Sequence, residues 1–364
     1  MAGSGAQVAA LPEATLWKIR IAAILWALLI IGCLLALPVM FDATAVLVVL
    51  AIVLAVLLGA AFAWLYRRFA GPVHGFLHDW LKFALATFCV LCILCAAPIY
   101  FMAVKAETDP ALLPRAVLTN GEKTVVYQGM MHIGSEPFYK QVVYDAEQAL
   151  SDGYVLYYEG VQPNPAGDKW FSDNLAGGGD LSANYKMLGE TCGLQFQLDY
   201  FGMLQKDMKE HPDRHVAADV DTLDMQNEFE RLMKTDPTFA AGYAKERAAE
   251  AEAGSTEVGA VNVAETLTPD QKKLSGYVCR YMMSNIAKGG SDPRQIEKII
   301  LDFRNRKLVE RIVSDPHDKI YITYGANHLK GIIPLLQKAD PRWTVESVTW
   351  IRPLQSPKSY EGEI

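Results

Sequence analysis

Three long apolar runs occupy the first third of the chain and restrict what it can fold into. They cover roughly residues 19–40, 43–66 and 81–103, and no acidic residue lies in the interior of any run. A helix needs about 20 apolar residues to span the hydrocarbon core of a bilayer. The sequence therefore predicts three transmembrane helices within residues 16–104, a tail at residues 1–15, and the lipid bilayer as a partner.

Positive charge is distributed unevenly around the predicted helices. Lys18 and Arg20 flank the start of the first run, and Arg67, Arg68 and Lys82 surround the loop between the second and third runs. The turn between the first and second runs has neither lysine nor arginine. Lys and Arg accumulate on the cytoplasmic side of membrane proteins. We therefore expect a cytoplasmic N-terminus and an extracytoplasmic polar domain.

Two cysteine patterns in the apolar runs have alternative interpretations. Residues 30–33 (Ile-Ile-Gly-Cys) resemble a bacterial lipobox, but residues 34–40 stay apolar, which favours the interior of a membrane helix. Cys89, Cys92 and Cys95 have the spacing of a metal or redox motif. On a helix they would form one stripe, and in a membrane run such thiols pack as small apolar groups. We favour packing for all of them.

His74 and His78 are one helical turn apart in the loop before the third run, a spacing that suits zinc. Gly71, Pro72 and Gly75 lie around them and interrupt helices. The favoured interpretation is an interfacial turn without a metal.

The composition argues against one class of partner. The chain has 364 residues and a formal net charge of −7, and no basic stripe interrupts its acidic balance. A nucleic-acid partner is not expected from such a charge distribution.

The polar part of the chain contains the same short pattern twice. Residues 124–132 and 319–328 each read as a buried strand followed by Gly-x-x-His, and each precedes a helical segment. Glycine permits a sharp turn or a close approach of the backbone to a ligand. Two copies are more specific than one, and they predict a pair of related functional turns. The alternative is that both histidines only cap helices or satisfy hydrogen bonds in the core.

The first copy opens a predicted β-α-β unit. A helix over about residues 137–151 separates the first motif strand from a strand at residues 154–158, which ends at Glu159. Such a unit favours parallel strands with a right-handed crossover. If these strands are neighbours, His132 and Glu159 meet at the carboxyl edge of the sheet, where ligands bind in open α/β sheets.

The remaining segments complete the expected organisation. His211 and His215 are expected at the surface, because such residues are mostly exposed. Cys192 and Cys279 are free to pair in an oxidising compartment.

The polar part divides into several expected segments. They are a linker at 105–115, an α/β domain at 116–354 with a loop or lid at 164–180 and a helical insert at about 184–314, a last strand at 343–351, and a tail at 355–364.

These motifs resemble the TraB/Tiki family, whose bacterial members are often labelled TraB/GumN. The resemblance covers most of residues 116–351. The family pattern has two Gly-x-x-His motifs, a glutamate that ends the second strand, and an arginine upstream of the second motif. Those positions correspond here to Gly129 and His132, Glu159, Arg304 or Arg306, and Gly325 and His328.

The resemblance implies a fold and a chemistry. The family fold is an α/β domain of two related halves around a mixed sheet, and Tiki-type members are membrane-anchored proteases that depend on a divalent metal. By analogy, His132, His328 and Glu159 would bind Mn, Co or Zn, with Glu159 as a ligand or general base and Arg304 or Arg306 stabilising the oxyanion. The resemblance also implies that the protein lies in the bacterial inner membrane, with a periplasmic domain that acts on a peptide or protein substrate.

Two other classes of function remain as alternatives. A membrane-tethered binding or signalling domain could keep this fold without catalysis. A transporter is disfavoured, because three spans without an intramembrane acidic pair offer no path for an ion.

Overall fold

The computed structural model describes residues 12–71, 74–175, 181–253, 266–289 and 294–355, and both predicted tails fall largely outside them. The chain divides into two compact units, with the boundary between Val104 and Lys105.

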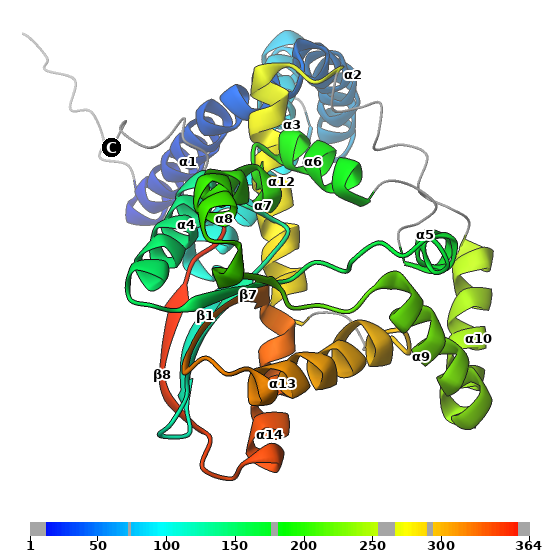
Figure 1. The fold of residues 1–364 in the computed structure, drawn as a ribbon. Helices are drawn as coiled ribbons and strands as arrows, with labels where there is room; N and C mark the ends of the chain where they lie inside the picture. The colour runs from blue at the N-terminus through cyan, green and yellow to red at the C-terminus, as the bar shows by residue number, and fades with distance from the viewer. Residues whose placement is uncertain (1–11, 72–73, 176–180, 254–265, 290–293, 356–364) are drawn as a thin grey trace, which may run out of the picture. The chain divides into compact units, whose positions relative to one another are not determined.

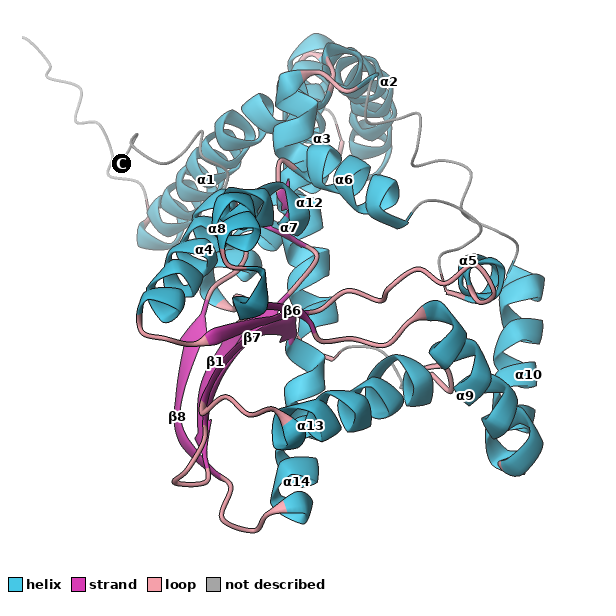
Figure 2. Cartoon of the chain, in the orientation of Figure 1, coloured by secondary structure: helices cyan, strands magenta, loops and turns pink. Residues whose placement is uncertain are grey.

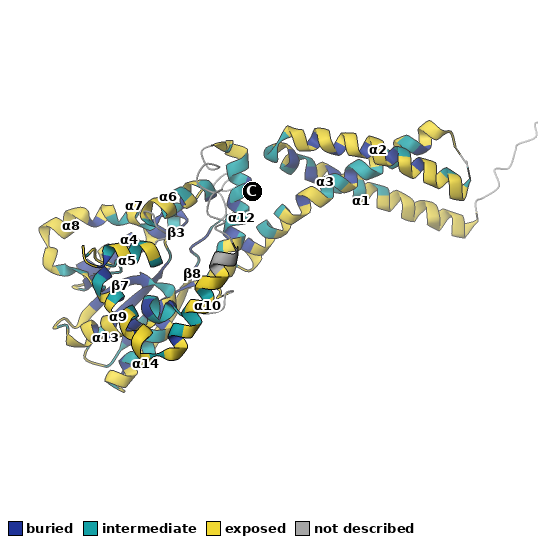
Figure 3. Ribbon diagram, turned by 90° about the vertical axis from the view of Figure 1, so that its right-hand side faces the viewer, coloured by how far each residue is buried: buried dark blue, intermediate teal, exposed yellow. Residues whose placement is uncertain are grey.

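The first unit consists of three long apolar helices, as predicted. They are α1 (Glu13–Ala43), α2 (Ala45–Ala70) and α3 (Phe76–Thr108), and each has the length and hydropathy of a membrane span. Most of their side chains are exposed in the protein (Figure 3), including many large apolar ones. Such a surface requires lipid rather than water, so the unit is suited to association with a membrane.

Small residues bring these helices close together. A β-carbon added at Gly59 of α2 would lie 2.6 Å from the backbone of Ala84 on α3. Cys33, Cys89 and Cys92 are buried in the apolar cluster of this unit, in agreement with the packing interpretation, whereas Cys95 is exposed and does not pack there. Small residues at helix contacts are typical of membrane bundles, where close backbone approach replaces the hydrophobic effect.

His74 and His78 lie on either side of the start of α3. His78 belongs to α3, whereas His74 precedes the helix, and their ring centroids are 4.8 Å apart. Arg67, in the last turn of α2, and Asp79, in the first turn of α3, form an ion pair at 3.2 Å.

The second unit is built on a six-stranded mixed sheet (Figure 2). Its order is β6-β4-β7-β2-β1-β8; β6, β4, β7 and β2 are parallel, and β1 and β8 are antiparallel to their neighbours. The strands are β1 (Leu113–Thr119), β2 (Thr124–Met130), β4 (Val155–Tyr158), β6 (His215–Ala217), β7 (Lys319–Gly325) and β8 (Thr344–Ile351).

Helices cover both faces of this sheet (Figure 1). The apolar residues of α4 (Glu136–Ser151) pack on one face with Leu156 and Tyr321. Those of α13 (Arg304–Ser314) and α14 (Leu329–Ala339) pack on the other face with Tyr157 and Ile322. The central strands are therefore buried on both sides, which is typical of parallel sheets.

The remaining elements surround the sheet. A two-residue strand pair, β3 (Ile133–Gly134) with β5 (Gln195–Phe196), lies just past the first Gly-x-x-His motif. Thr268 caps α12 in a capping box with Pro269 at the first helical position, as its sequence predicts. The helices are α5 (Asp168–Asn174), α6 (Leu181–Cys192), α7 (Gln197–Phe201), α8 (Gln205–Glu210), α9 (Thr222–Thr235), α10 (Pro237–Ala253), α12 (Pro269–Ala287) and a π-helix (Lys298–Phe303) before α13.

The expected adjacency of the strands that carry His132 and Glu159 is wrong. β7, the strand of the second motif, lies between β2 and β4 and pairs in parallel with both. The crossover through α4 therefore skips one position in the sheet. As a result, the two Gly-x-x-His strands are direct neighbours, and Met130 stands opposite Gly325 in the register.

Other boundaries also differ from the prediction. The connection expected at 105–115 is shorter, because α3 continues to Thr108 and β1 begins at Leu113. The expected loop or lid at 164–180 contains helix α5, and residues 176–180 lie outside the described part of the chain.

The helical insert expected at about 184–314 contributes a strand, because residues 215–217 form β6 beside β4. His215 is consequently buried, with a side chain only 2% exposed, and it binds Asp207 and Tyr158. The expectation that it lies at the surface is wrong, although His211 is exposed as expected.

Candidate functional site

Glu159 stands at the carboxyl end of β4 and contacts two parts of the chain. Its Oε2 accepts a hydrogen bond from the backbone N–H of Gly325 at 2.5 Å, and its Oε1 accepts one from Nη2 of Arg304 at 2.7 Å. A β-carbon at position 325 would lie 3.2 Å from the same carboxylate. The motif glycine therefore lets the carboxylate approach the end of β7 closely.

Arg304, the first residue of α13, binds a second carboxylate. Its Nε and Nη2 donate to the two oxygens of Asp219 at 2.9 and 2.5 Å. Asp219 follows β6 and also accepts the backbone N–H groups of Gly160 and Val220. Burial works against the charge of Asp219, but the hydrogen bonds and charge of Arg304 hold the pKa of this carboxyl below its usual range.

His328 is buried at the end of the second motif with a defined tautomer. Its Nδ1 lies 2.7 Å from Oδ1 of Asn305, an acceptor, so Nδ1 carries the proton and Nε2 keeps its lone pair. Nε2 lies 3.7 Å from Oε1 of Glu159 and 3.5 Å from Nη1 of Arg304. Burial, together with the charge of Arg304, lowers the pKa of His328 to about 4. The imidazole is therefore neutral at neutral pH.

His132 leaves the neighbouring strand and is held separately. Its ring stacks on Tyr185 with centroids 4.4 Å apart, and its Nδ1 lies 3.0 Å from the side-chain amide of Gln197. Burial lowers the pKa of His132, while the charges of Glu159 and Arg304 act on it in opposite directions. These electrostatic interactions place His132 in the field of the other site residues, although the structure gives it no hydrogen bond to them.

A side-chain hydrogen bond also joins the two motifs. Tyr127 Oη donates to the carbonyl oxygen of Gly325 at 2.6 Å, which links the strand of one motif to the glycine of the other. A β-carbon at Gly129 would lie 2.8 Å from the carbonyl oxygen of Pro114. Close packing therefore requires glycine at position 129, whereas a β-carbon at position 325 would press on the Glu159 carboxylate.

The donor set can be tested for a divalent ion. Within the described residues, no three His, Cys, Asp or Glu side chains are close enough together to hold a metal ion. Two of the three predicted ligands, His328 and Glu159, are close enough to share one ion, because two ligands that each lie about 2.1 Å from an ion can be separated by as much as about 4.2 Å. The 3.7 Å between Nε2 of His328 and Oε1 of Glu159 lies within that limit. His132 is not part of this pair.

The structure separates the two candidate arginines. Arg306 pairs with Glu228 at 2.7 Å, and its side chain is 43% exposed. It makes no recorded contact with Glu159 or His328, whereas Arg304 contacts both. Arg304 is therefore the arginine of the site.

Two residues of the cluster were absent from the sequence prediction. Asp219 was overlooked because its strand, β6, has only three residues and lies in a mainly helical region. Asn305 stands between the two candidate arginines. Its contact with His328 depends on the packing of α13 against the end of the second motif, which the sequence does not show. The sequence offers little signal for Asp219, because Val216 is the only β-prone residue among residues 215–217.

The two cysteines of the polar part form a disulfide. Cys192, at the end of α6, is bonded to Cys279 in α12, with Cα atoms 5.7 Å apart. Their pairing agrees with the expectation for an oxidising compartment.

Comparisons with family models, with curated proteins and with solved structures find no match to this chain. The fold and the site therefore define the protein only as a mixed α/β domain that follows three apolar helices and has an acid–histidine–arginine cluster at its carboxyl edge.

Proposed function

We propose that this chain is a membrane-anchored hydrolase of the TraB/Tiki type that uses a divalent metal ion and cleaves peptide or protein substrates near the membrane surface. The observation that carries the proposal is the 3.7 Å approach of His328 Nε2 to Glu159 Oε1 at the carboxyl edge of a parallel sheet. An unprotonated imidazole nitrogen beside a carboxylate is a donor set suited to Mn, Co or Zn. His328 and Glu159 would hold the ion. His132, the third ligand expected from the resemblance, lies outside this pair and would have to move toward it to become a donor.

Each residue of the cluster has a role in this proposal. A bound divalent ion would supply an acidified water molecule and polarise a carbonyl group. Asn305 holds the proton of His328 on Nδ1 and so leaves Nε2 as an acceptor, a typical function of a residue behind a metal ligand. Glu159 is placed to accept a proton as a general base. Arg304, whose charge Asp219 maintains, would stabilise negative charge that develops on the carbonyl oxygen.

The proposed location is the bacterial inner membrane, with the N-terminus in the cytoplasm and the α/β domain in the periplasm. The uneven distribution of lysine and arginine around the three apolar helices supports this orientation. The Cys192–Cys279 disulfide supports it independently, because disulfides persist in oxidising compartments.

Hydrolysis by the full-length protein in detergent tests the proposal. Metal-free protein is supplied with Mn²⁺, Co²⁺ or Zn²⁺ and a set of fluorogenic peptide and ester substrates. We expect metal-dependent cleavage that is lost in His132→Ala/His328→Ala. His211→Ala is the matched control, because His211 is exposed and outside the cluster. Cleavage that persists in the double variant would overturn the assignment.

A non-catalytic binding or signalling domain is the second candidate, and one observation favours it. Both oxygens of Glu159 already accept hydrogen bonds, from Arg304 and Gly325, so the carboxylate is satisfied without a metal. Elemental analysis of protein purified without chelators, followed by titration with Mn²⁺, Co²⁺ and Zn²⁺, separates the two functions. Absence of any bound divalent ion would favour the binding domain.

A further inference from the structure

Residues outside the main sheet hold the His132 imidazole. Tyr185 of α6 stacks on the ring at 25° between planes, and Gln197 binds both the ring Nδ1 and, through its backbone N–H, the carbonyl oxygen of His132, each at 3.0 Å. The next residue, Ile133, pairs with Phe196 in the β3–β5 ladder. We call Tyr185, Phe196 and Gln197 the His132 wall. It fixes both the face and one edge of the imidazole.

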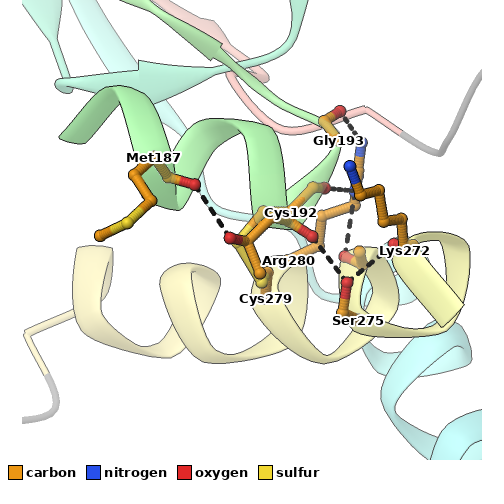
Figure 4. Close-up of a disulfide and its surroundings, with 9 residues drawn as sticks. Met187, Cys192, Gly193, Lys272, Ser275, Cys279 and Arg280 are labelled. Atoms are coloured by element: carbon orange, nitrogen blue, oxygen red, sulfur yellow. Dashed lines mark hydrogen bonds between the residues drawn. A yellow bond between two sulfur atoms is a disulfide. The ribbon is translucent and has the colours of Figure 1, made fainter. Parts of the chain in front are cut away.

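The disulfide anchors the segment that carries this wall. Cys192 ends the helix on which Tyr185 lies, and β5 begins three residues later. The bond to Cys279 joins this segment to α12, which is 87 residues away in the sequence. Arg280, next to Cys279, donates to the carbonyl oxygens of Cys192 and Gly193 at 2.9 and 3.2 Å (Figure 4).

The disulfide and the residues around His132 also share one apolar cluster. The cluster contains Ile133, Cys192, Leu194 and Leu354, with Met131, Tyr185 and Cys279 packed against it. Motion of α6 relative to α12 would therefore reach the residues on both sides of His132. The covalent bond is the strongest restraint on that motion, because the other contacts are hydrogen bonds and apolar packing.

We propose that the Cys192–Cys279 disulfide is a redox-sensitive clamp on the His132 wall, and that Tyr185 and Gln197 are positioning residues for His132. In the oxidised protein, the clamp holds the imidazole in one orientation. In the reduced protein, the wall loosens and the imidazole loses its stacking partner. The consequence for hydrolysis rests on the proposed function, but the coupling between the disulfide and the imidazole does not.

Opening of the clamp requires a dithiol reductant. It supplies two electrons and two protons, the bond between the two sulfurs breaks, each cysteine becomes a thiol, and the reductant becomes a disulfide. Cys192 is completely buried, whereas Cys279 is partly exposed, so Cys279 is the more accessible of the two cysteines.

The test observes the imidazole directly in metal-free, full-length protein in detergent. The chain has seven histidines, which are labelled with ¹³C, and the His132 signal is assigned by its loss in His132→Gln. Spectra are compared before and after dithiothreitol, with thiol titration to verify two additional thiols. Cys192→Ser/Cys279→Ser lacks the disulfide and so reproduces the reduced protein without reductant. Tyr185→Leu removes only the stacked ring. Cys95→Ser is the control for the free thiols.

We expect reduction to move the His132 signal by more than a linewidth, in the direction seen for Tyr185→Leu, while the His328 signal stays in place. His328 is held by Asn305 on the other side of the site and is the internal control. An unchanged His132 signal after complete reduction would overturn the proposal. Movement of both signals to the positions of unfolded histidine would also overturn it, since the disulfide would then stabilise the whole fold. Neither readout needs a metal or turnover, so the result is independent of the proposed hydrolase activity.

Discussion

Arg304 and Asp219 form a two-point ion pair, with Nε to Oδ1 at 2.9 Å and Nη2 to Oδ2 at 2.5 Å. Both side chains are almost completely buried. A buried pair contributes less than its Coulomb energy, because desolvation opposes it, but loss of one partner leaves the other charge uncompensated. The pair therefore fixes the arginine that also contacts Glu159, and it connects β6 with α13.

Asp219→Asn tests the importance of this pair for stability. The amide keeps the shape of the carboxylate but leaves the buried guanidinium without its main counter-charge, so we expect a loss of roughly 3–5 kcal/mol in the free energy of unfolding. Denaturant unfolding of the full-length protein in detergent measures it. Glu122→Gln, which breaks the exposed pair with Arg342, should lower stability far less, because solvent screens exposed ion pairs. Equal losses in the two variants would contradict the prediction.

His328 should make stability depend on pH. Its pKa is about 4 in the folded protein and near 6.5 in the unfolded chain. The unfolded chain therefore binds more protons between these values, so the stabilisation is complete above pH 6.5 and is lost as pH falls toward 4. The total is on the order of 3 kcal/mol, since one pKa unit corresponds to about 1.4 kcal/mol.

Unfolding free energies measured from pH 7 to pH 4 check this prediction. His328→Gln removes the titrating group, so its stability should fall less steeply than that of the wild type over this range. His317→Gln is the control, because the His317 side chain is half exposed. The prediction fails if the wild type and His328→Gln have the same slope.

Gly331 should tolerate no side chain. A β-carbon there would lie 2.3 Å from Nδ2 of Asn305, which must then move away from His328. Gly331→Ala should cost roughly 1–3 kcal/mol, the usual range for overpacking, and should also change the tautomer of His328 in NMR spectra. Gly160→Ala is the matched control, because its nearest neighbour is 3.8 Å away. A normal His328 tautomer in Gly331→Ala would refute this account of the glycine.

In the membrane unit, Gly59 should be the glycine that tolerates an added side chain least. An added β-carbon would meet the backbone of Ala84 at 2.6 Å, and the backbone cannot yield without separating α2 from α3. At Gly32 the obstacle is the flexible end of Ile93, at 2.8 Å, which can rotate away. Gly59→Ala should therefore lower the thermal unfolding midpoint in detergent more than Gly32→Ala. The reverse order would show that the helices do not pack through Gly59.

The sequence determined the features that depend on local pattern. Apolar length alone predicts α1, α2 and α3, because a bilayer sets how many apolar residues a spanning helix needs. Asn120-Gly121 and Thr268 are residues that favour a hairpin turn and a helix N-cap, because their side chains or flexible backbone suit such turns, and the structure has the β1–β2 hairpin and the start of α12 there. The repeated Gly-x-x-His pattern predicts the two turns. The resemblance to the TraB/Tiki family groups Glu159 with their histidines, and the structure places Glu159 3.7 Å from His328.

The tertiary structure alone decided which strands are neighbours and which charges meet. β7 enters between β2 and β4, and the three residues of β6 join the sheet, because pairing between distant strands depends on the whole fold rather than on local propensity. That order brings Asp219 to Arg304 across 85 residues and Asn305 to His328 across 23. Burial at these contacts then sets the charge of each group, so the chemistry of Gly-x-x-His is determined by residues that lie outside the motif.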